Sequence, residues 1–157
     1  MSEQLKVTGE VAASPEQVFA VLADPARHPE IDGSGMLRGL AEGGPISGPG
    51  ETFTMNMNNS ILDDYQVTNR VTVFEPGRRI GWSPCGLAGD TLDRLGDMKP
   101  GGQSFTFELE PSSSGGTTVT QVYDWSGVED PKFKGLMPFL KEEHLAGTIE
   151  RLGKVAG

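Results

Sequence analysis

Residues 103–125 read QSFTFELEPSSSGGTTVTQVYDW, and this stretch decides the fold. Apolar and polar side chains alternate on both sides of a Pro/Ser/Gly segment at 111–116. Alternation with a period of two is typical of a half-buried strand, and the segment between the two runs is typical of a turn. The stretch therefore predicts a β-hairpin with one inward face. The inward side chains are expected to be Phe105, Phe107, Leu109, Val119, Gln121, Tyr123 and Trp125.

Five more stretches carry strand signals, and the segments between them are rich in glycine and proline. Between Gly43 and Gly50, for example, most residues are glycine or proline, which breaks regular structure. Together with the hairpin, these stretches predict seven strands. They are expected at 5–13, 36–41, 51–58, 63–74, 79–82, 103–110 and 117–125.

Two helix-capping patterns follow the first strand. Residues 14–17 read SPEQ, which places a serine at the N-cap, a proline at the first helical position and a glutamine that can reach back to the cap. Asp24 and Pro25 repeat the cap-then-proline pattern, and Pro29 limits this second helix to about two turns. Two short helices are therefore expected between the first and second strands.

A longer helix is expected at the C-terminal end of the chain. Asp130 and Pro131 again form a cap and first turn, and apolar residues then recur at spacings of three and four. Pro138 lies inside this pattern, where it should bend the first turns or mark a break. The stripe consists of Leu136, Leu140, His144, Leu145, Ile149 and Leu152.

Residues 84–102 show no strand alternation. Structureless loops longer than about 12–15 residues are uncommon in compact domains and often act as lids or binding loops. A surface excursion with one short helix is the alternative, and both interpretations stay open.

Composition excludes several classes of protein. The formal net charge is -9 and the basic residues are scattered, so nucleic acid is not an expected partner. Cys85 is the only cysteine, which excludes an internal disulfide. No apolar run approaches the roughly 18 residues of a membrane span, and no signal peptide is recognisable, so no membrane insertion and a cytoplasmic location are expected. The length of 157 residues predicts one domain, residues 1–157.

Several strings resemble the START-like superfamily, also called SRPBCC or helix-grip, and in particular its polyketide cyclase/dehydrase-like bacterial members. They are VAASPEQVF at 11–19, VTVFEPGRR at 71–79, FTFELEP at 105–111 and GTTVT at 116–120. The resemblance implies an α+β fold in which a curved antiparallel seven-stranded sheet wraps around a long C-terminal helix. It also implies a ligand cavity between the two, but the superfamily supports many activities, so the fold does not assign one.

Strand and helix parity then predicts the residues that line such a cavity. Methionine and aromatic side chains make a polarisable lining suited to a flat apolar ligand, although the same residues could simply fill a closed core. The candidate ligand-binding residues are Phe53, Met55, Met57, Tyr65, Asn69, Trp82, Phe107, Gln121, Tyr123, Trp125, Met137, Leu140 and His144.

Catalytic signals are sparse. His144 and Tyr123 are weak candidates for proton transfer, and a structural histidine bonded to Tyr123 or to a backbone carbonyl is the alternative. His28 and Glu30 border the short helices, where loops can ring the mouth of a cavity, but a surface role is the preferred expectation for both. The two histidines are far apart in sequence without flanking acidic ligands, and no phosphate-binding loop occurs, so no metal and no cofactor are expected.

Three functions remain in order of preference. The first is binding of a small hydrophobic or aromatic molecule, polyketide-like or lipid-like, in the internal cavity. The second is an enzyme of the polyketide cyclase, dehydratase or aromatase type. The third is a protein-interaction or chaperone-cofactor module. The expected partner is a small hydrophobic molecule, and the protein is expected to be a monomer or homodimer.

Overall fold

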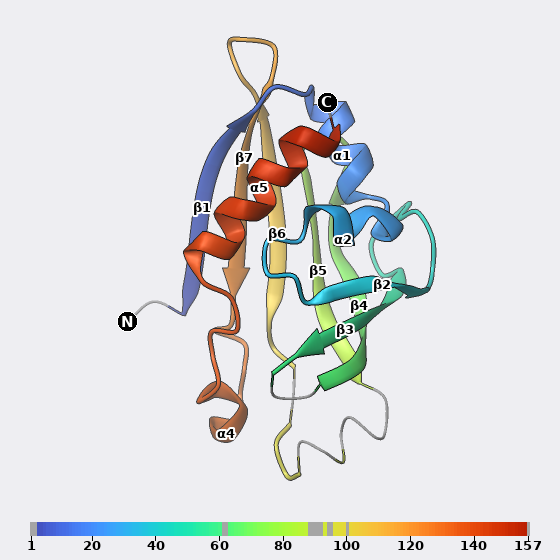
Figure 1. Cartoon of the computed structure of the whole chain (residues 1–157), viewed down its shortest axis with the longest axis vertical. Coiled ribbons are helices and arrows are strands. Elements are labelled where there is room, and N and C mark those ends of the chain that lie inside the picture. Colours follow the sequence, from blue (N-terminus) through green and yellow to red (C-terminus); the bar gives the residue numbers. More distant parts are fainter. Residues whose placement is uncertain (1–2, 61–62, 88–92, 94–95, 100, 157) are drawn as a thin grey trace.

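Seven antiparallel strands form one curved sheet in the computed structural model, which describes residues 3–60, 63–87, 93, 96–99 and 101–156. The predicted seven-stranded α+β helix-grip fold is confirmed. The strand order is β1-β7-β6-β5-β4-β3-β2, so the first and last strands pair and β2 forms the far edge (Figure 1). The strands are β1 (Gln4–Val11), β2 (Leu37–Glu42), β3 (Thr52–Asn59), β4 (Asp63–Glu75), β5 (Arg79–Leu87), β6 (Ser104–Pro111) and β7 (Thr117–Asp124).

The β6–β7 hairpin has the register that its alternation predicts. Phe105 lies opposite Tyr123, and Phe107 lies opposite Gln121. The turn is closed by a hydrogen bond from the backbone N–H of Ser112 to the carbonyl of Gly116 (3.0 Å). Gly115 has φ +88°, a conformation in which a side chain would be strained, which explains a glycine in this turn.

Two short helices and a 3-10 turn lie between β1 and β2: α1 (Pro15–Leu22), η1 (Pro25–Arg27) and α2 (His28–Ile31). The predicted capping box is present at the start of α1. The backbone N–H of Gln17 donates to Ser14 Oγ (3.2 Å), and the backbone N–H of Ser14 donates to Gln17 Oε1 (2.9 Å). These bonds satisfy backbone donors that have no partner inside the helix.

The long C-terminal helix is broken into α4 (Pro131–Lys134) and α5 (Glu142–Ala156). Pro138, which the sequence marks as a bend or a break, lies in the non-helical segment between them and follows a cis peptide bond. The break has a physical reason, because a proline has no N–H to continue the helical ladder. Figure 1 shows that α5 crosses the sheet beside β1 and β7, while α4 lies beyond the end of β7.

β5 is longer than the sequence predicts. Its alternation ends at Trp82, but pairing with β4 continues through Pro84 to Leu87, so residues 84–87 of the expected 84–102 loop form strand instead. A register shift next to the pair Asn69 and Pro84 accommodates the proline, which cannot donate to a regular ladder. Residues 88–92, 94–95 and 100 lie outside the described part of the chain, so the choice between a lid and a surface excursion stays open.

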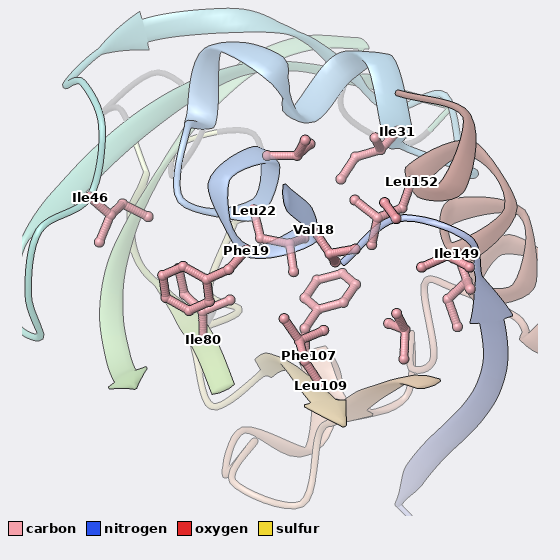
Figure 2. Close-up of a cluster of buried hydrophobic side chains, with 14 of the residues drawn as sticks. Val18, Phe19, Leu22, Ile31, Ile46, Ile80, Phe107, Leu109, Ile149 and Leu152 are labelled. Carbon is pink, nitrogen blue, oxygen red and sulfur yellow. The ribbon is translucent and has the colours of Figure 1, made fainter. Parts of the chain in front are cut away.

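Buried apolar side chains form two clusters. The larger one packs α1 and α5 against β6 and neighbouring strands, and Figure 2 shows Val18 and Leu22 of α1 beside Leu152 of α5. The smaller cluster lies toward α4 and the start of α5. Its buried members are Tyr123, Trp125, Val128, Phe133, Leu140 and Leu145.

Candidate functional site

A cavity of about 450 Å³ opens inside the fold, and members of both apolar clusters line it. Its walls come from α2 and the segment after it, from β2 to β7, from α4 and the segment between α4 and α5, and from Thr148 of α5. Most lining side chains are apolar. The apolar and aromatic lining includes Ile31, Met36, Leu37, Phe53, Met55, Met57, Val67, Trp82, Leu87, Phe105, Phe107, Phe133, Leu136, Phe139 and Leu140.

Four rings form a connected aromatic wall of this cavity. His28 is stacked on Trp82, with ring centroids 4.7 Å apart and planes inclined by 20°. Phe53 meets both rings edge-on, with each centroid 5.7 Å away, and Phe107 lies 5.9 Å from Trp82. Such rings hold one another in place and offer a flat, polarisable surface to a ligand.

His28 is uncharged in this wall. It is only 3% exposed, and its Nε2 lies 2.8 Å from the carbonyl oxygen of Leu22. Because a carbonyl only accepts, Nε2 carries the proton and Nδ1 is left as an acceptor. Burial lowers the pKa of His28 to about 4, and the hydrogen bond to Leu22 and the nearby Asp24 and Asp32 offset only part of this effect.

The surface role predicted for His28 is therefore wrong. Rigid stacking on Trp82 and packing of α2 against the sheet bury the ring. The sequence did contain a signal for burial of His28, because it lies three residues before the apolar Ile31 and therefore on the same helical face. Both residues are buried in the structure. Glu30 is exposed and forms an ion pair with Arg27 at 3.6 Å, which agrees with the surface role expected for it.

Neutral polar groups complete the lining. Asn69 and Gln121 are each 5% exposed, and Gln103 is also buried. The hydroxyl of Tyr65 accepts a hydrogen bond from Asn59 Nδ2 (3.1 Å). Burial raises the pKa of Tyr65, so this phenol is uncharged at neutral pH.

Asp32 is the one charged side chain among the described residues that line the cavity, and its carboxylate is already bonded. It accepts from the backbone N–H of Ser34 (3.0 Å), from the hydroxyl of Ser34 (2.7 Å) and from the backbone N–H of Leu37 (2.9 Å). These bonds tie α2 to β2. The cavity therefore offers a ligand mainly apolar surface and uncharged polar groups.

Most of the side chains predicted to line the cavity lie in its wall. They are Phe53, Met55, Met57, Tyr65, Asn69, Trp82, Phe107, Gln121 and Leu140. The structure places the remaining four candidates, Tyr123, Trp125, Met137 and His144, outside this lining. Parity alone could not separate the two groups, because both face the interior and only the packing between elements leaves a void beside one of them.

Tyr123 lies outside the cavity lining and holds the neighbouring segments together. Its ring is stacked on Phe105 at 4.9 Å, and its hydroxyl donates to Gln103 Oε1 (2.5 Å) and accepts from the backbone N–H of Phe139 (3.3 Å). Met137 Sδ lies 3.6 Å from the same hydroxyl, and the ring of Trp125 lies 5.3 Å from the ring of Tyr123. Burial raises the pKa of Tyr123 to about 12.

His144 caps α5. Its Nδ1 accepts the backbone N–H of Lys141 (2.9 Å), and it lies at the third position of the helix. The sequence suggested a partner in Tyr123 or a backbone carbonyl, whereas the observed partner is a backbone N–H. One turn later Thr148, which lines the cavity, accepts the backbone N–H of Gly33 (2.9 Å) and joins α5 to the segment after α2.

The candidate residues did not cover the whole lining, and His28, Gln103 and Thr148 are among the polar cavity residues that sequence reasoning missed. Gln103 has the same parity as Phe105 and Phe107, so the sequence predicts that its side chain points inward. It lies one residue before the start of β6. Thr148 lies one turn after His144 on α5. In the described ranges no three His, Cys, Asp or Glu side chains gather as a metal site, and no helix there is long and apolar enough to cross a membrane.

Removing the Tyr123 hydroxyl should destabilise the fold. A Tyr123→Phe variant leaves Gln103 Oε1 and the Phe139 N–H without this partner, so its free energy of unfolding should fall by about 2 kcal/mol. Urea unfolding measures the change. The control is Tyr65→Phe, which loses one bond to Asn59 and should cost less than about 1 kcal/mol. Equal losses in the two variants would contradict this stabilising role of the Tyr123 hydroxyl.

A curved sheet that grips a C-terminal helix around an internal cavity defines a helix-grip protein, and comparison with known proteins agrees. The chain belongs to the polyketide cyclase / dehydrase and lipid transport family, whose model matches residues 3–156. An uncharacterized protein of Mycobacterium tuberculosis is 34% identical over 151 residues, which cover 94% of this chain. The chain spans about 60% of the length of this relative.

Solved structures show the same fold at low sequence identity. Protein Ms6760 from Mycobacterium smegmatis has a TM-score of 0.67 and 17% identity, with 98% of this chain and 90% of that chain covered. A norcoclaurine synthase mutant from Thalictrum, in complex with a transition state analogue, has a TM-score of 0.66 and 14% identity, with 99% and 94% covered. These similarities establish the fold and carry no activity over to this chain.

Proposed function

We propose that this protein binds one small, uncharged hydrophobic molecule in the cavity that the sheet forms with α2, the segment between α4 and α5, and Thr148 of α5. The observation that carries the proposal is the cavity of about 450 Å³ with its aromatic wall and uncharged polar groups. Ligand sites of proteins commonly have volumes of about 300–1,000 Å³ and combine apolar walls with a few polar groups.

Burial of apolar surface favours ligand binding in this cavity. The rings of Trp82 and Phe53 and the thioether of Met55 line it and can make dispersion contacts with a ligand. An apolar ligand supplies those contacts and removes its own surface from water, at about 25 cal/mol per Å² of apolar area. The proposal is for binding because Tyr123 and His144, the candidates for proton transfer, are bonded elsewhere and do not line the cavity.

Filling the cavity with a side chain should prevent binding. Val67 lines the cavity, so a Val67→Trp variant should bind an aromatic probe such as 2-naphthol roughly tenfold more weakly or worse, at a folding cost of about 1–3 kcal/mol. Ligand-detected NMR measures the affinity. Native mass spectrometry of freshly purified protein, with extraction of any bound molecule, measures occupancy by a cellular ligand.

The matched control is Gln66→Trp. Gln66 is the preceding residue of β4 and is exposed on the opposite face of the sheet, where its amide bonds Asn56. This variant should bind the probe as the wild type does. Equal binding by the two tryptophan variants would contradict a site in this cavity. A wild-type protein that carries no molecule and binds no aromatic probe would contradict the proposed function itself.

A further inference from the structure

Gln121 is a buried polar residue whose hydrogen bonding is incomplete. It is 5% exposed and lines the cavity, and its Oε1 has no hydrogen-bond partner among the described residues. An unpartnered buried acceptor destabilises a folded protein, and a leucine or methionine at this position would not incur this cost. A ligand in the cavity can supply a hydrogen bond to this group.

The position of Gln121 suits it to contact a ligand. It lies in β7 directly opposite Phe107, and side chains of directly opposed residues have Cβ atoms about 4.5–5.5 Å apart. Phe107 in turn lies 5.9 Å from Trp82 in the aromatic wall. The last torsion of a glutamine is soft, so turning the amide can bring Oε1 toward the cavity without moving the strand. A ring that packs on Phe107 and Trp82 therefore has Gln121 within reach of its substituents.

The other lining groups restrict the charge of the ligand. In the described lining no Lys or Arg side chain is available to pair with an anion, and Asp32 is engaged by Ser34 and Leu37. His28 is buried and uncharged. A charged ligand would lose its hydration without a compensating partner, which is far more costly than burying a neutral hydroxyl.

We propose that Gln121 is the polar anchor of the cavity and accepts a hydrogen bond from the hydroxyl of an uncharged hydroxylated aromatic ligand. This assignment rests on the proposed function and makes Gln121 a specificity-determining residue. Its amide oxygen favours ligands that carry a donor over ligands of the same shape without one, because only a donor gives Oε1 a hydrogen-bond partner. The aromatic wall supplies most of the affinity, and Gln121 selects among flat apolar molecules.

The test compares three naphthalene probes at neutral pH by ligand-detected NMR, with protein titrated into a fixed low concentration of each probe. The probes are 2-naphthol, which donates a hydrogen bond, 2-methoxynaphthalene, which does not, and the anion of 2-naphthoic acid. The wild type should bind 2-naphthol about fivefold to tenfold more tightly than the methoxy compound, as expected for one net hydrogen bond, and should bind the anion most weakly.

A Gln121→Met variant keeps a long, flexible side chain and removes the acceptor. It should bind 2-naphthol and 2-methoxynaphthalene with equal affinity. It should also unfold at a higher urea concentration than the wild type, because an unpartnered buried oxygen is removed. The control is Val122→Met, at the next residue of β7 on the other face, which should keep the wild-type preference for 2-naphthol.

The outcomes separate the anchor from the proposed function. Binding of both neutral probes without preference for 2-naphthol, or a preference that survives in Gln121→Met, would overturn the anchor and leave the cavity as a ligand site. Tightest binding of the anion would also overturn it. Binding of no probe by the wild type would count against the proposed function and the anchor together.

Discussion

Lowering the pH from about 7 to about 4.5 is expected to destabilise the wild-type protein by about 2 kcal/mol more than it destabilises a His28→Gln variant. The reason is the buried imidazole of His28, whose pKa falls from 6.5 to about 4 in the folded protein because burial penalises the charged form. At pH values between these two pKa values, the unfolded chain binds a proton at His28 and the folded chain does not.

The sign of the change in stability with pH follows from this difference in bound protons. Stability that comes from the neutral His28 is fully present above pH 6.5, decreases as the pH falls below that value, and is lost near pH 4. Protonation would place a charge at a ring that is stacked on Trp82 and is 3% exposed. The ring lines the cavity, so the same protonation should also weaken binding of a neutral ligand below pH 4.

Urea unfolding at a series of pH values measures this effect. Glutamine at position 28 can still donate to the carbonyl of Leu22 and does not titrate, so the comparison concerns the slope of stability against pH rather than its absolute value. Carboxylates contribute to both slopes and cancel in the difference. Parallel slopes for the two proteins would show that His28 is not buried in its neutral form.

A Gly33→Ala variant is expected to lose about 3 kcal/mol of stability or to fold poorly, because overpacking against a rigid backbone cannot be relieved by a side-chain rotation. A Cβ at Gly33 would lie 2.1 Å from the carbonyl oxygen of His144 and 2.8 Å from the backbone nitrogen of Thr148. The segment after α2 therefore has to move away from α5. This movement breaks the hydrogen bond from the Gly33 N–H to Thr148 Oγ1.

The matched control is Gly147→Ala, which changes a glycine on the other side of the same contact. A Cβ there would meet Gly33 Cα at 3.6 Å, an ordinary contact, and alanine favours a helix interior over glycine by about 1 kcal/mol. Thermal or urea unfolding should show a loss for Gly33→Ala and no loss, or a small gain, for Gly147→Ala. Similar losses in both variants would contradict the close approach of α2 to α5.

The fold was predictable because its signals are local. Capping at Ser14, alternation through 103–125 and breakers between the strands each depend on neighbouring residues, and the observed elements follow them within a few residues. The extension of β5 was not predictable in this way. Pro84 argues against a strand locally, and only pairing with β4 across a register shift keeps it in the sheet.

The cavity lining was only partly predictable from strand parity. Parity states which side of the sheet a residue faces, and it identified Met55, Asn69 and Gln121 as inward residues that the structure places in the cavity wall. It could not distinguish a side chain beside a void from one packed against another element. Tyr123 shares the parity of Gln121 but is covered by Gln103 and Phe139.

Local sequence patterns thus specify the strands, the caps and the inward faces, because hydrogen bonding and burial within an element depend on spacing along the chain. They specify neither the end of β5 nor the identity of the cavity wall. Those features depend on contacts between distant segments, such as His28 on Trp82 and Gly33 on α5, whose geometry arises only when the elements pack. The role of His28 changed most, from an expected surface residue to part of the aromatic wall, because a four-residue helix is oriented by what it packs against.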